Sequence, residues 1–131
     1  LYLSEGKEGI IMDSIDLREY CRGEEDKERL EHYVQQRAQN GLADCDTWNF
    51  DAYLGWIIVK GLRQLARTTH SYPERFNDCD TWRGILEHLA DDFVELINEV
   101  QSITTPLRDN FDEELKDCFL RLSEIFFDLW D

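Results

Sequence analysis

Basic residues are scarce in this chain of 131 residues, where 14 lysines and arginines stand against 29 aspartates and glutamates. The formal net charge of −15 argues against direct binding of nucleic acid or of an anionic membrane, because both require a basic face. Long apolar runs are missing as well: the longest, residues 52–59, is far shorter than the roughly 18 residues that a membrane-spanning helix needs. We therefore expect a protein without direct contacts to nucleic acid or membrane.

Cysteines are few, and their spacing excludes the familiar cysteine sites. Cys21, Cys45, Cys79 and Cys118 include no Cys-x-x-Cys pair, so neither a zinc ribbon nor a thioredoxin-type site has support. A domain of this size can bury a sufficient core without disulfides. We expect four reduced thiols and a cytoplasmic protein.

Proline and strand signals are also rare. Both prolines lie between stretches of helical periodicity, and no window shows the alternation of a strand. Apolar residues recur every three or four positions over 24–40, 48–68, 81–103 and 111–129, and a short helix fits 13–21. The sequence predicts one all-α domain over residues 1–131, an antiparallel bundle of four main helices with a short N-terminal helix. Met12 is the only methionine, and residues 1–12 are either native or a flexible leader.

The apolar positions also predict the buried side of each helix. They are Leu30, Tyr33, Val34 and Ala38 in the first helix, Phe50, Leu54, Ile57, Ile58, Leu62 and Leu65 in the second, Trp82, Ile85, Leu89, Phe93, Leu96, Val100 and Ile103 in the third, and Phe111, Leu115, Cys118, Leu122, Ile125 and Leu129 in the fourth. Gly55 and Gly61 each weaken the second helix by about 1 kcal/mol relative to alanine, which a close helix–helix approach would explain. Trp130 is expected to be partly exposed and available to a partner.

A pentapeptide occurs twice, as Asp44-Cys-Asp-Thr-Trp48 and as Asp78-Cys-Asp-Thr-Trp82. Each copy precedes a predicted helix, and aspartate and threonine are preferred at helix N-termini. The sequence predicts two similar N-caps, with Thr47 or Asp46 in the first copy and Thr81 in the second. The alternative, two carboxylate clusters that hold a metal ion, lacks the glycine and the distal glutamate of a calcium loop.

The acidic residues are concentrated near the end of the sequence, since residues 78–131 contain 15 acids and 4 bases. Two sets of carboxylates each share a helix face. They are Glu87, Asp91, Glu95 and Glu99 on the third helix, and Asp112, Glu113, Asp117 and Asp128 on the fourth. A solvated face that keeps the protein soluble is the simpler interpretation. The functional alternative is a negative face that mimics a nucleic-acid backbone, although Lys60, Arg63 and Arg67 could neutralise part of the first set.

Four segments between residues 41 and 131 are distinctive. They are Asp44-Cys-Asp-Thr-Trp48 with Asp51, Leu62-Arg-Gln-Leu-Ala-Arg-Thr-Thr-His70 before Tyr72-Pro73, Leu86-Glu-His-Leu-Ala-Asp-Asp-Phe93, and Phe126-Phe-Asp-Leu-Trp-Asp131. Together they resemble a group of small tailed-phage and prophage proteins without an established activity. Asp78-Cys-Asp departs from that pattern, which has an aromatic residue and glutamates at this place. The resemblance implies a phage or prophage context.

Another set of carboxylates resembles an enzyme family. Glu24-Glu-Asp-Lys-Glu28 and Glu87-His-Leu-Ala-Asp91 are similar to the motifs of the all-α, MazG-like nucleotide pyrophosphohydrolases. The resemblance implies a Mg²⁺ ion held against a triphosphate by Glu24, Glu28, Glu87 and Asp91. The two motifs lie farther apart than in that family, with a whole predicted helix between them.

The preferred hypothesis is a non-enzymatic acidic protein, without cofactor or metal, that binds a protein partner with a basic surface. The two sets of carboxylates are its candidate contact residues, and a host nucleic-acid-binding or defence protein that it inhibits is its candidate partner. Two alternatives stay open. One is the Mg²⁺-dependent pyrophosphohydrolase, and the other is a virion or assembly component whose apolar faces form a homo-oligomer.

Overall fold

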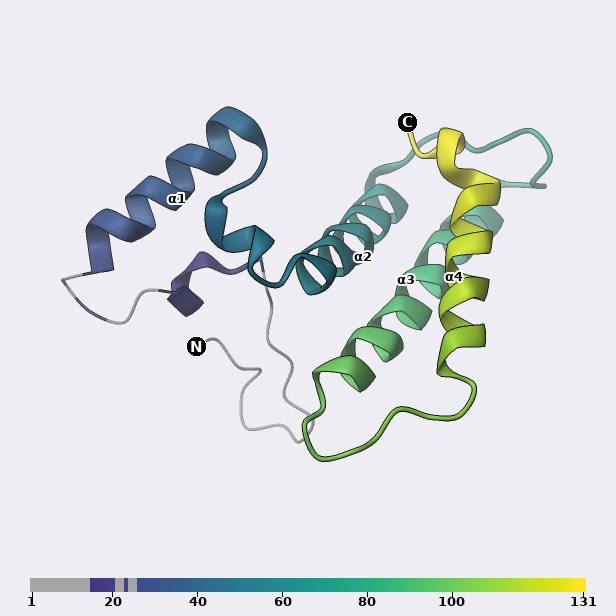
Figure 1. Ribbon diagram of the computed structural model, residues 1–131. Helices are drawn as coiled ribbons and strands as arrows, with labels where there is room; N and C mark the ends of the chain where they lie inside the picture. Colours follow the sequence, from purple (N-terminus) through teal and green to yellow (C-terminus); the bar gives the residue numbers. More distant parts are fainter. Residues whose placement is uncertain (1–14, 21–22, 24–25) are drawn as a thin grey trace. The chain divides into compact units, whose positions relative to one another are not determined.

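The computed structural model describes residues 15–20, 23 and 26–131, which contain helices and no strand. Four α-helices lie in this part of the chain: α1 (Lys27–Asn40), α2 (Phe50–Thr68), α3 (Cys79–Gln101) and α4 (Phe111–Ile125) (Figure 1). Three short 3-10 helices accompany them: η1 (Leu17–Tyr20), η3 (Asp44–Thr47) and η4 (Phe126–Asp128). The predicted all-α class with four main helices is confirmed. The short helix predicted over 13–21 corresponds to η1, and residues 1–12 lie outside the described residues.

The chain divides into two compact units, and the division falls inside α2, between Trp56 and Ile57. The N-terminal unit contains η1, α1, η3 and the start of α2. The C-terminal unit contains the rest of α2 with α3, α4 and η4. The single domain expected over residues 1–131 stays a prediction. None of the helices in the described ranges combines the length and the apolar character that crossing a membrane requires.

A buried ion pair connects the parts of the N-terminal unit. Asp46 of η3 is 1% exposed, and its two carboxylate oxygens accept hydrogen bonds from the Arg37 guanidinium at 2.9 and 2.6 Å. The same carboxylate accepts the backbone N–H of Ala43 at 2.8 Å, and Arg37 also donates to the carbonyl of Ile15 at 2.6 Å. The guanidinium lies over the ring of Tyr53, 5.1 Å from its centroid. One arginine of α1 therefore holds η3, the start of α2 and the segment before η1.

The two copies of the repeated pentapeptide adopt different structures. In the second copy Asp78 is the N-cap of α3, and its side chain accepts the backbone N–H of Thr81 at 2.7 Å. In the first copy Asp44–Thr47 forms η3, and the Asp46 carboxylate binds Arg37 instead of capping α2. The prediction of two similar caps is therefore wrong for the first copy. In the second copy the cap is Asp78 and not Thr81, because only the aspartate side chain reaches a free first-turn N–H.

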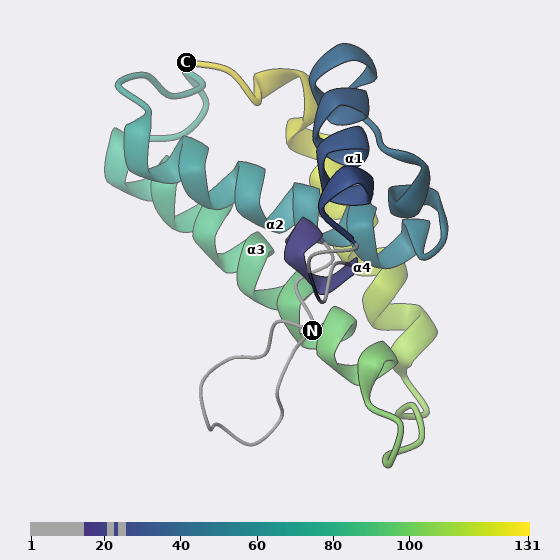
Figure 2. The ribbon, with the colours of Figure 1, turned by 90° about the vertical axis from the view of Figure 1, so that its left-hand side faces the viewer.

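The central helix of the C-terminal unit is α3. Its buried residues are Trp82, Leu86, Leu89, Ala90, Phe93, Leu96 and Ile97. The part of α2 after Trp56 runs beside α3 in the opposite direction, and α4 then returns along α3 (Figure 1, Figure 2). Phe93 of α3 meets Phe119 of α4 edge to face, with 5.3 Å between the ring centroids. Successive helices of this unit are thus antiparallel, as predicted for a bundle.

The buried side of α2 differs from the predicted side. Val59 is 0% exposed and Leu62 and Ala66 are also buried, whereas Ile57 is 42% exposed. Of the side predicted to be buried, Leu62 alone is buried, while Phe50, Leu54 and Ile57 are exposed and Ile58 and Leu65 are half-buried. The buried side of α2 in the C-terminal unit thus includes the small side chains of Val59 and Ala66 beside Leu62. The part of α2 after Trp56 therefore has a second apolar face, which the rest of the C-terminal unit does not cover.

The other predicted rows hold at their centres and fail at their ends. Cys118, Leu122 and Ile125 of α4 are buried as expected. Val100 and Ile103 are exposed, and Ile103 lies beyond α3, which ends at Gln101 and not at the predicted residue 103. In α1, Tyr33 is buried, Leu30 is half-buried, and Val34 and Ala38 are exposed. The stop at Asn40-Gly41 is confirmed, since Gly41 adopts a left-handed conformation with φ of 81°.

Replacing Arg37 by alanine should lower the free energy of unfolding by about 3–5 kcal/mol, because Asp46 would stay buried without its cation. Denaturant titration measures this loss. The double variant Arg37→Ala with Asp46→Ala should be more stable than the sum of the two single losses implies. Strict additivity of the single losses would contradict the coupling of these side chains.

The two faces of α2 should respond differently to truncation. Val59→Ala should destabilise the protein by about 2 kcal/mol, because it opens a cavity in a fully buried position. Ile57→Ala removes more atoms but should cost less than about 1 kcal/mol, because much of this side chain is in water. Midpoints of chemical denaturation compare the two variants, and a larger loss for Ile57→Ala would mean that the originally predicted face is the buried one.

Candidate functional site

The carboxylates of α3 lie along one helix face, but two of the four are bound by arginines. Asp91 accepts a hydrogen bond from Arg63 of α2 at 2.8 Å. Glu99 accepts the backbone N–H and the Nε of Arg108, each at 2.7 Å, and the backbone N–H is the main cause of its lowered pKa. Glu87 is half-buried and Glu95 is exposed, and neither forms an ion pair in the described part of the chain. Of Lys60, Arg63 and Arg67, which the sequence offered as residues that could neutralise part of this set, Arg63 forms an ion pair with Asp91.

The carboxylates of α4 show the same division. Asp117 pairs with Arg121 at 2.9 Å, and Asp128, just after the helix, pairs with Arg75 of the loop between α2 and α3. Asp112 and Glu113 are exposed in the first turn of α4, without an ion pair among the described residues. Their place at the helix N-terminus is favourable, because the helix dipole stabilises negative charge there.

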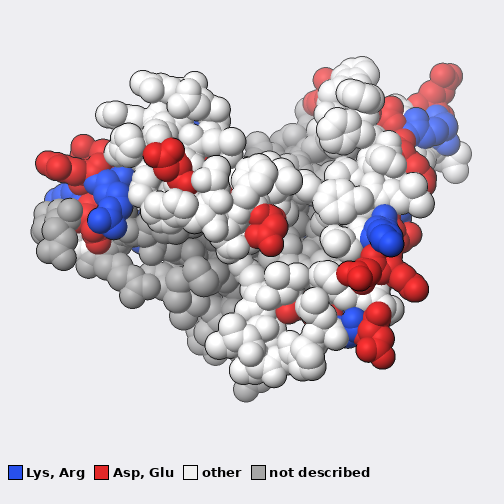
Figure 3. Space-filling view, viewed as in Figure 1, with Lys and Arg blue, Asp and Glu red and all other residues white. Residues whose placement is uncertain are grey.

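Half of the eight predicted contact residues therefore form no ion pair with an arginine of the described chain, although the charge of Arg108 also attracts Glu95. These four are Glu87, Glu95, Asp112 and Glu113, which we call the unpaired carboxylates. Asp91, Glu99, Asp117 and Asp128 form ion pairs with arginines, so the two negative faces expected from the sequence are partly neutralised within the chain. Figure 3 shows this mixture at the edge of the C-terminal unit, where blue and red side chains alternate.

An apolar groove lies between α2 and the end of α4. Its volume is about 290 Å³. It is lined by Ile57, Ile58, Gly61, Leu62 and Leu65 from α2 and by Leu122, Phe126 and Leu129 from α4 and the residues after it. A Cβ atom on Gly61 would meet no heavy atom within 4 Å, so the close helix–helix approach expected at this glycine is absent within the described chain. The uncovered face of α2 forms one wall of the groove.

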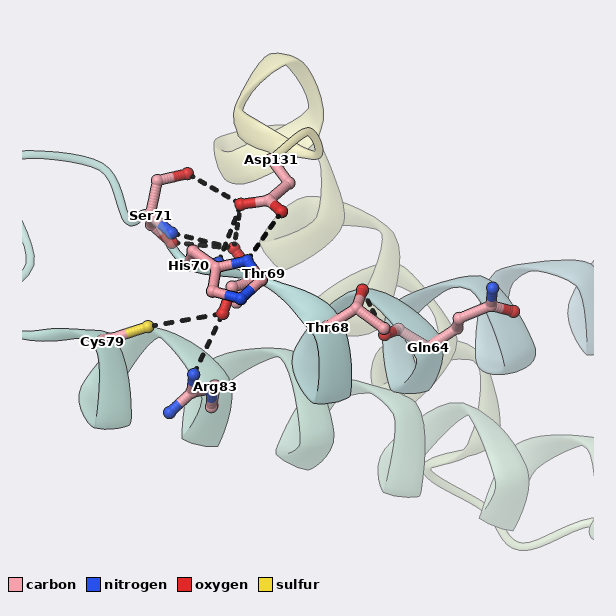
Figure 4. Close-up of polar contacts among 8 residues, drawn as sticks. All are labelled: Gln64, Thr68, Thr69, His70, Ser71, Cys79, Arg83 and Asp131. Carbon is pink, nitrogen blue, oxygen red and sulfur yellow. Dashed lines mark hydrogen bonds and ion pairs between the residues drawn. The ribbon is translucent and has the colours of Figure 1, made fainter.

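A cluster of polar side chains surrounds Asp131 at the end of the chain (Figure 4). One oxygen of Asp131 accepts the backbone N–H of His70 at 2.8 Å and the hydroxyls of Thr69 and Ser71 at 3.2 Å each. The carbonyl of Thr69 in turn accepts a hydrogen bond from Arg83 of α3 at 2.9 Å. These bonds, above all the His70 N–H, lower the pKa of Asp131 to about 2. The cluster fixes the residues after α4 to the end of α2 and to α3.

The residues suggested for a Mg²⁺-dependent enzyme have not gained support. Glu24 lies outside the described residues, and Asp91 is bound to Arg63. Within residues 15–20, 23 and 26–131, no three His, Cys, Asp or Glu side chains come together as a metal ion would require. The pyrophosphohydrolase therefore remains an alternative without a structural observation in its favour.

The cysteines in the described part of the chain are free thiols, namely Cys45, Cys79 and Cys118, and Cys21 lies outside it. Burial raises the pKa of Cys45 to about 11 and also raises the pKa of Cys118. A thiol with a raised pKa is rarely a thiolate near neutral pH and reacts slowly. Cys118 serves as a small apolar residue of α4, as its position in the predicted row indicated.

Sequence reasoning missed the groove and the Asp131 cluster. The groove had a signal, because α2 carries apolar residues on nearly every side and a single neighbour can cover only one of them. In the cluster, Asp131 contacts Thr69 and His70, which precede it in the sequence by 62 and 61 positions. No local sequence pattern predicts a contact over such a separation. The Thr-Thr-His and Leu-Trp-Asp segments, singled out as distinctive, are the two pieces that meet there.

Comparisons of the chain with family models, with curated proteins and with solved structures each found no match. The likeness to tailed-phage proteins thus stays a hypothesis. Function has to be argued from the geometry of the chain itself.

Asp131→Asn should lower the free energy of unfolding at neutral pH, because an amide accepts these hydrogen bonds less well than a carboxylate. The folded pKa of about 2 lies below that of an unfolded aspartate. The stabilisation is therefore complete above about pH 4 and is lost as the pH falls towards the folded value. Urea midpoints of the wild type and the variant should differ at neutral pH and converge on acidification. A difference that is constant with pH would contradict this role, and exposed Glu124→Gln is the control.

Proposed function

We propose that this chain is a non-enzymatic helical protein that binds a protein partner through the negative surface of its C-terminal unit. The observation that carries the proposal is the set of unpaired carboxylates on two helices that pack against each other. Residues 57–131 contain sixteen acids and eight bases. Five of the six arginines in this range form ion pairs with carboxylates, namely Arg63, Arg75, Arg83, Arg108 and Arg121. A cationic surface on another protein is the natural complement.

The partner we propose is a host protein with a basic surface, either a nucleic-acid-binding protein or a defence protein, which the chain inhibits in the cytoplasm. The phage or prophage context suggested by the sequence segments supports this choice. Carboxylates held on packed helices need little reordering when they meet lysines or arginines, and they steer a basic partner into contact. Such steering raises the association rate and weakens as salt screens the charges.

Strict imitation of a nucleic-acid backbone is less well supported than side-chain pairing. With Asp91 and Glu99 bound to arginines, Glu87 and Glu95 remain on α3, eight residues apart. That separation is roughly 12 Å along a helix. Duplex DNA presents about seven phosphate charges over the same length. The carboxylates are too sparse to copy a duplex, but their spacing suits individual contacts with lysine and arginine side chains.

The test compares two variants that remove the same charge from different places. The surface variant replaces the unpaired carboxylates, as Glu87→Gln, Glu95→Gln, Asp112→Asn and Glu113→Gln. The control variant replaces exposed carboxylates elsewhere, as Glu28→Gln, Glu31→Gln, Asp44→Asn and Glu74→Gln. Each change leaves the buried residues untouched, so both variants should fold, which circular dichroism verifies.

The immobilised wild type is used to capture its partner from host lysate, and the captured protein is purified for titration against all three chains. We expect the surface variant to bind at least about tenfold more weakly at low salt, with the control close to wild type. The difference should narrow at high salt, because screening removes the contribution of the charges. Equal affinity of all three chains would contradict the proposal, and so would an equal loss in both variants.

A further inference from the structure

An apolar hollow and protruding aromatic side chains lie next to each other in the C-terminal unit. Phe126 lines the groove and is 53% exposed, and the neighbouring Phe127 and Trp130 are 89% and 68% exposed. The rings of Phe126 and Phe127 meet edge to face, with 5.2 Å between their centroids. The exposure expected for Trp130 is confirmed. The same short segment thus supplies part of the hollow and the side chains that project beside it.

We propose that this face binds a second copy of the chain, so that aromatic residues of each copy enter the groove of the other. A two-fold interface brings one surface against itself, and such a surface needs both a hollow and a side chain to fill it. A cavity of about 150 Å³ holds a benzene molecule. The groove, at about 290 Å³, has room for an aromatic ring of the second copy.

The distribution of charge favours a second copy over a basic protein at this face. The groove is lined by apolar residues and one glycine, without a charged side chain. Figure 3 shows a largely white surface over α2 and α4 in the C-terminal unit, with the charged side chains at its outer edge. Two chains with a net charge of −15 repel each other wherever carboxylates face carboxylates. They can meet at an uncharged face, where a basic partner would find nothing to pair with.

The exposed aromatic side chains supply a large part of the apolar area that a dimer needs. A buried aromatic side chain removes about 150–250 Å² from water. The exposures of Phe126, Phe127 and Trp130 therefore leave roughly 300–500 Å² of aromatic surface on three residues. Ile57 and the rest of the groove extend this towards the roughly 800 Å² that each partner of a standard interface contributes.

Gly61 gives an independent reason to expect a neighbour at the groove. A glycine inside an exposed helix turn destabilises the helix relative to alanine. Within the described chain, Gly61 does not allow a close contact with another element, because the space at its Cβ position is open. A helix or an aromatic ring of a second copy could approach the α2 backbone closely at this position, which would explain why a glycine is tolerated there.

The first measurement is the mass of the full chain in solution, by sedimentation velocity and light scattering from low micromolar to near-millimolar concentration. We expect a reversible change from one to two chains as the concentration rises. Added salt should strengthen this association, because it screens the repulsion between acidic chains while apolar contacts persist. Binding of the basic partner should weaken with salt, so the failure of one proposal can be distinguished from the failure of the other.

The second measurement uses two matched substitutions, Gly61→Glu at the groove and Gly84→Glu on α3. Both glycines are exposed in a helix, and at both a Cβ would meet no heavy atom within 4 Å. Each variant gains helix propensity and one negative charge, so both should stay folded. Gly61→Glu should weaken dimerisation about a hundredfold or more, because the two-fold axis places two glutamates in the apolar interface. Gly84→Glu should dimerise like the wild type, apart from the added repulsion.

A wild type that stays monomeric at every concentration and salt would overturn the proposal. Dimers that form equally well with Gly61→Glu and Gly84→Glu would also overturn it, because the interface would then lie elsewhere. Growth beyond two chains would exclude the two-fold arrangement. Loss of the dimer in Gly61→Glu alone, with unchanged circular dichroism, is the supporting result.

Discussion

The burial of α3 on one broad side governs the C-terminal unit. That side can be covered only if α2 and α4 each turn a face towards it. On α2 the face contains Val59 and Ala66, and on α4 it contains Cys118 and Ile125. Because both neighbours turn to α3, they do not turn fully to each other, and the large residues of their other apolar faces remain beside the groove. The groove thus results from the way in which α2 and α4 cover α3, and not from the size of a single side chain.

The arginines select which carboxylates stay negative. Arg63 joins α2 to α3, Arg121 joins α4 to α3, and Arg108 joins the loop before α4 to both α3 and α4. Exposed pairs of this kind contribute only about 0–1 kcal/mol each to stability, so they are not what holds the fold. Their larger effect is on the surface, because they neutralise carboxylates such as Asp91 and Glu99, while Glu95 and Asp112 form no ion pair within the described chain. The charge pattern therefore depends on helix packing as much as on sequence.

Local signals in the sequence predicted the helices. The features that were not predicted depend on contacts between residues far apart in the sequence. The periodicity of α3 and the left-handed Gly41 after α1 depend on near neighbours, and both were predictable. The pentapeptide could not be interpreted locally, because the partner of Asp46 is Arg37 on another helix, whereas Asp78 meets a free N–H in its own turn. The face of α2 was ambiguous for the same reason, since an apolar helix fits a neighbour on either side. Of the acidic site, the stripe on α3 was predictable and so was some neutralisation from α2, but the pairing of Glu99 with Arg108 was not foreseen.

The negative and apolar surfaces of the C-terminal unit are compatible because they lie on different sides. Since α2 and α4 both pack on the buried side of α3, the exposed side with Glu95 is turned away from the groove between them. Pairing of two chains at the groove would therefore leave the carboxylates of both copies open to a partner. Once one copy is bound, the second meets a neighbouring basic site at a raised effective concentration, which strengthens binding without any new contact. An acidic surface with few charges forms only a few weak contacts with a partner. Its affinity therefore increases most when two copies of the surface bind together.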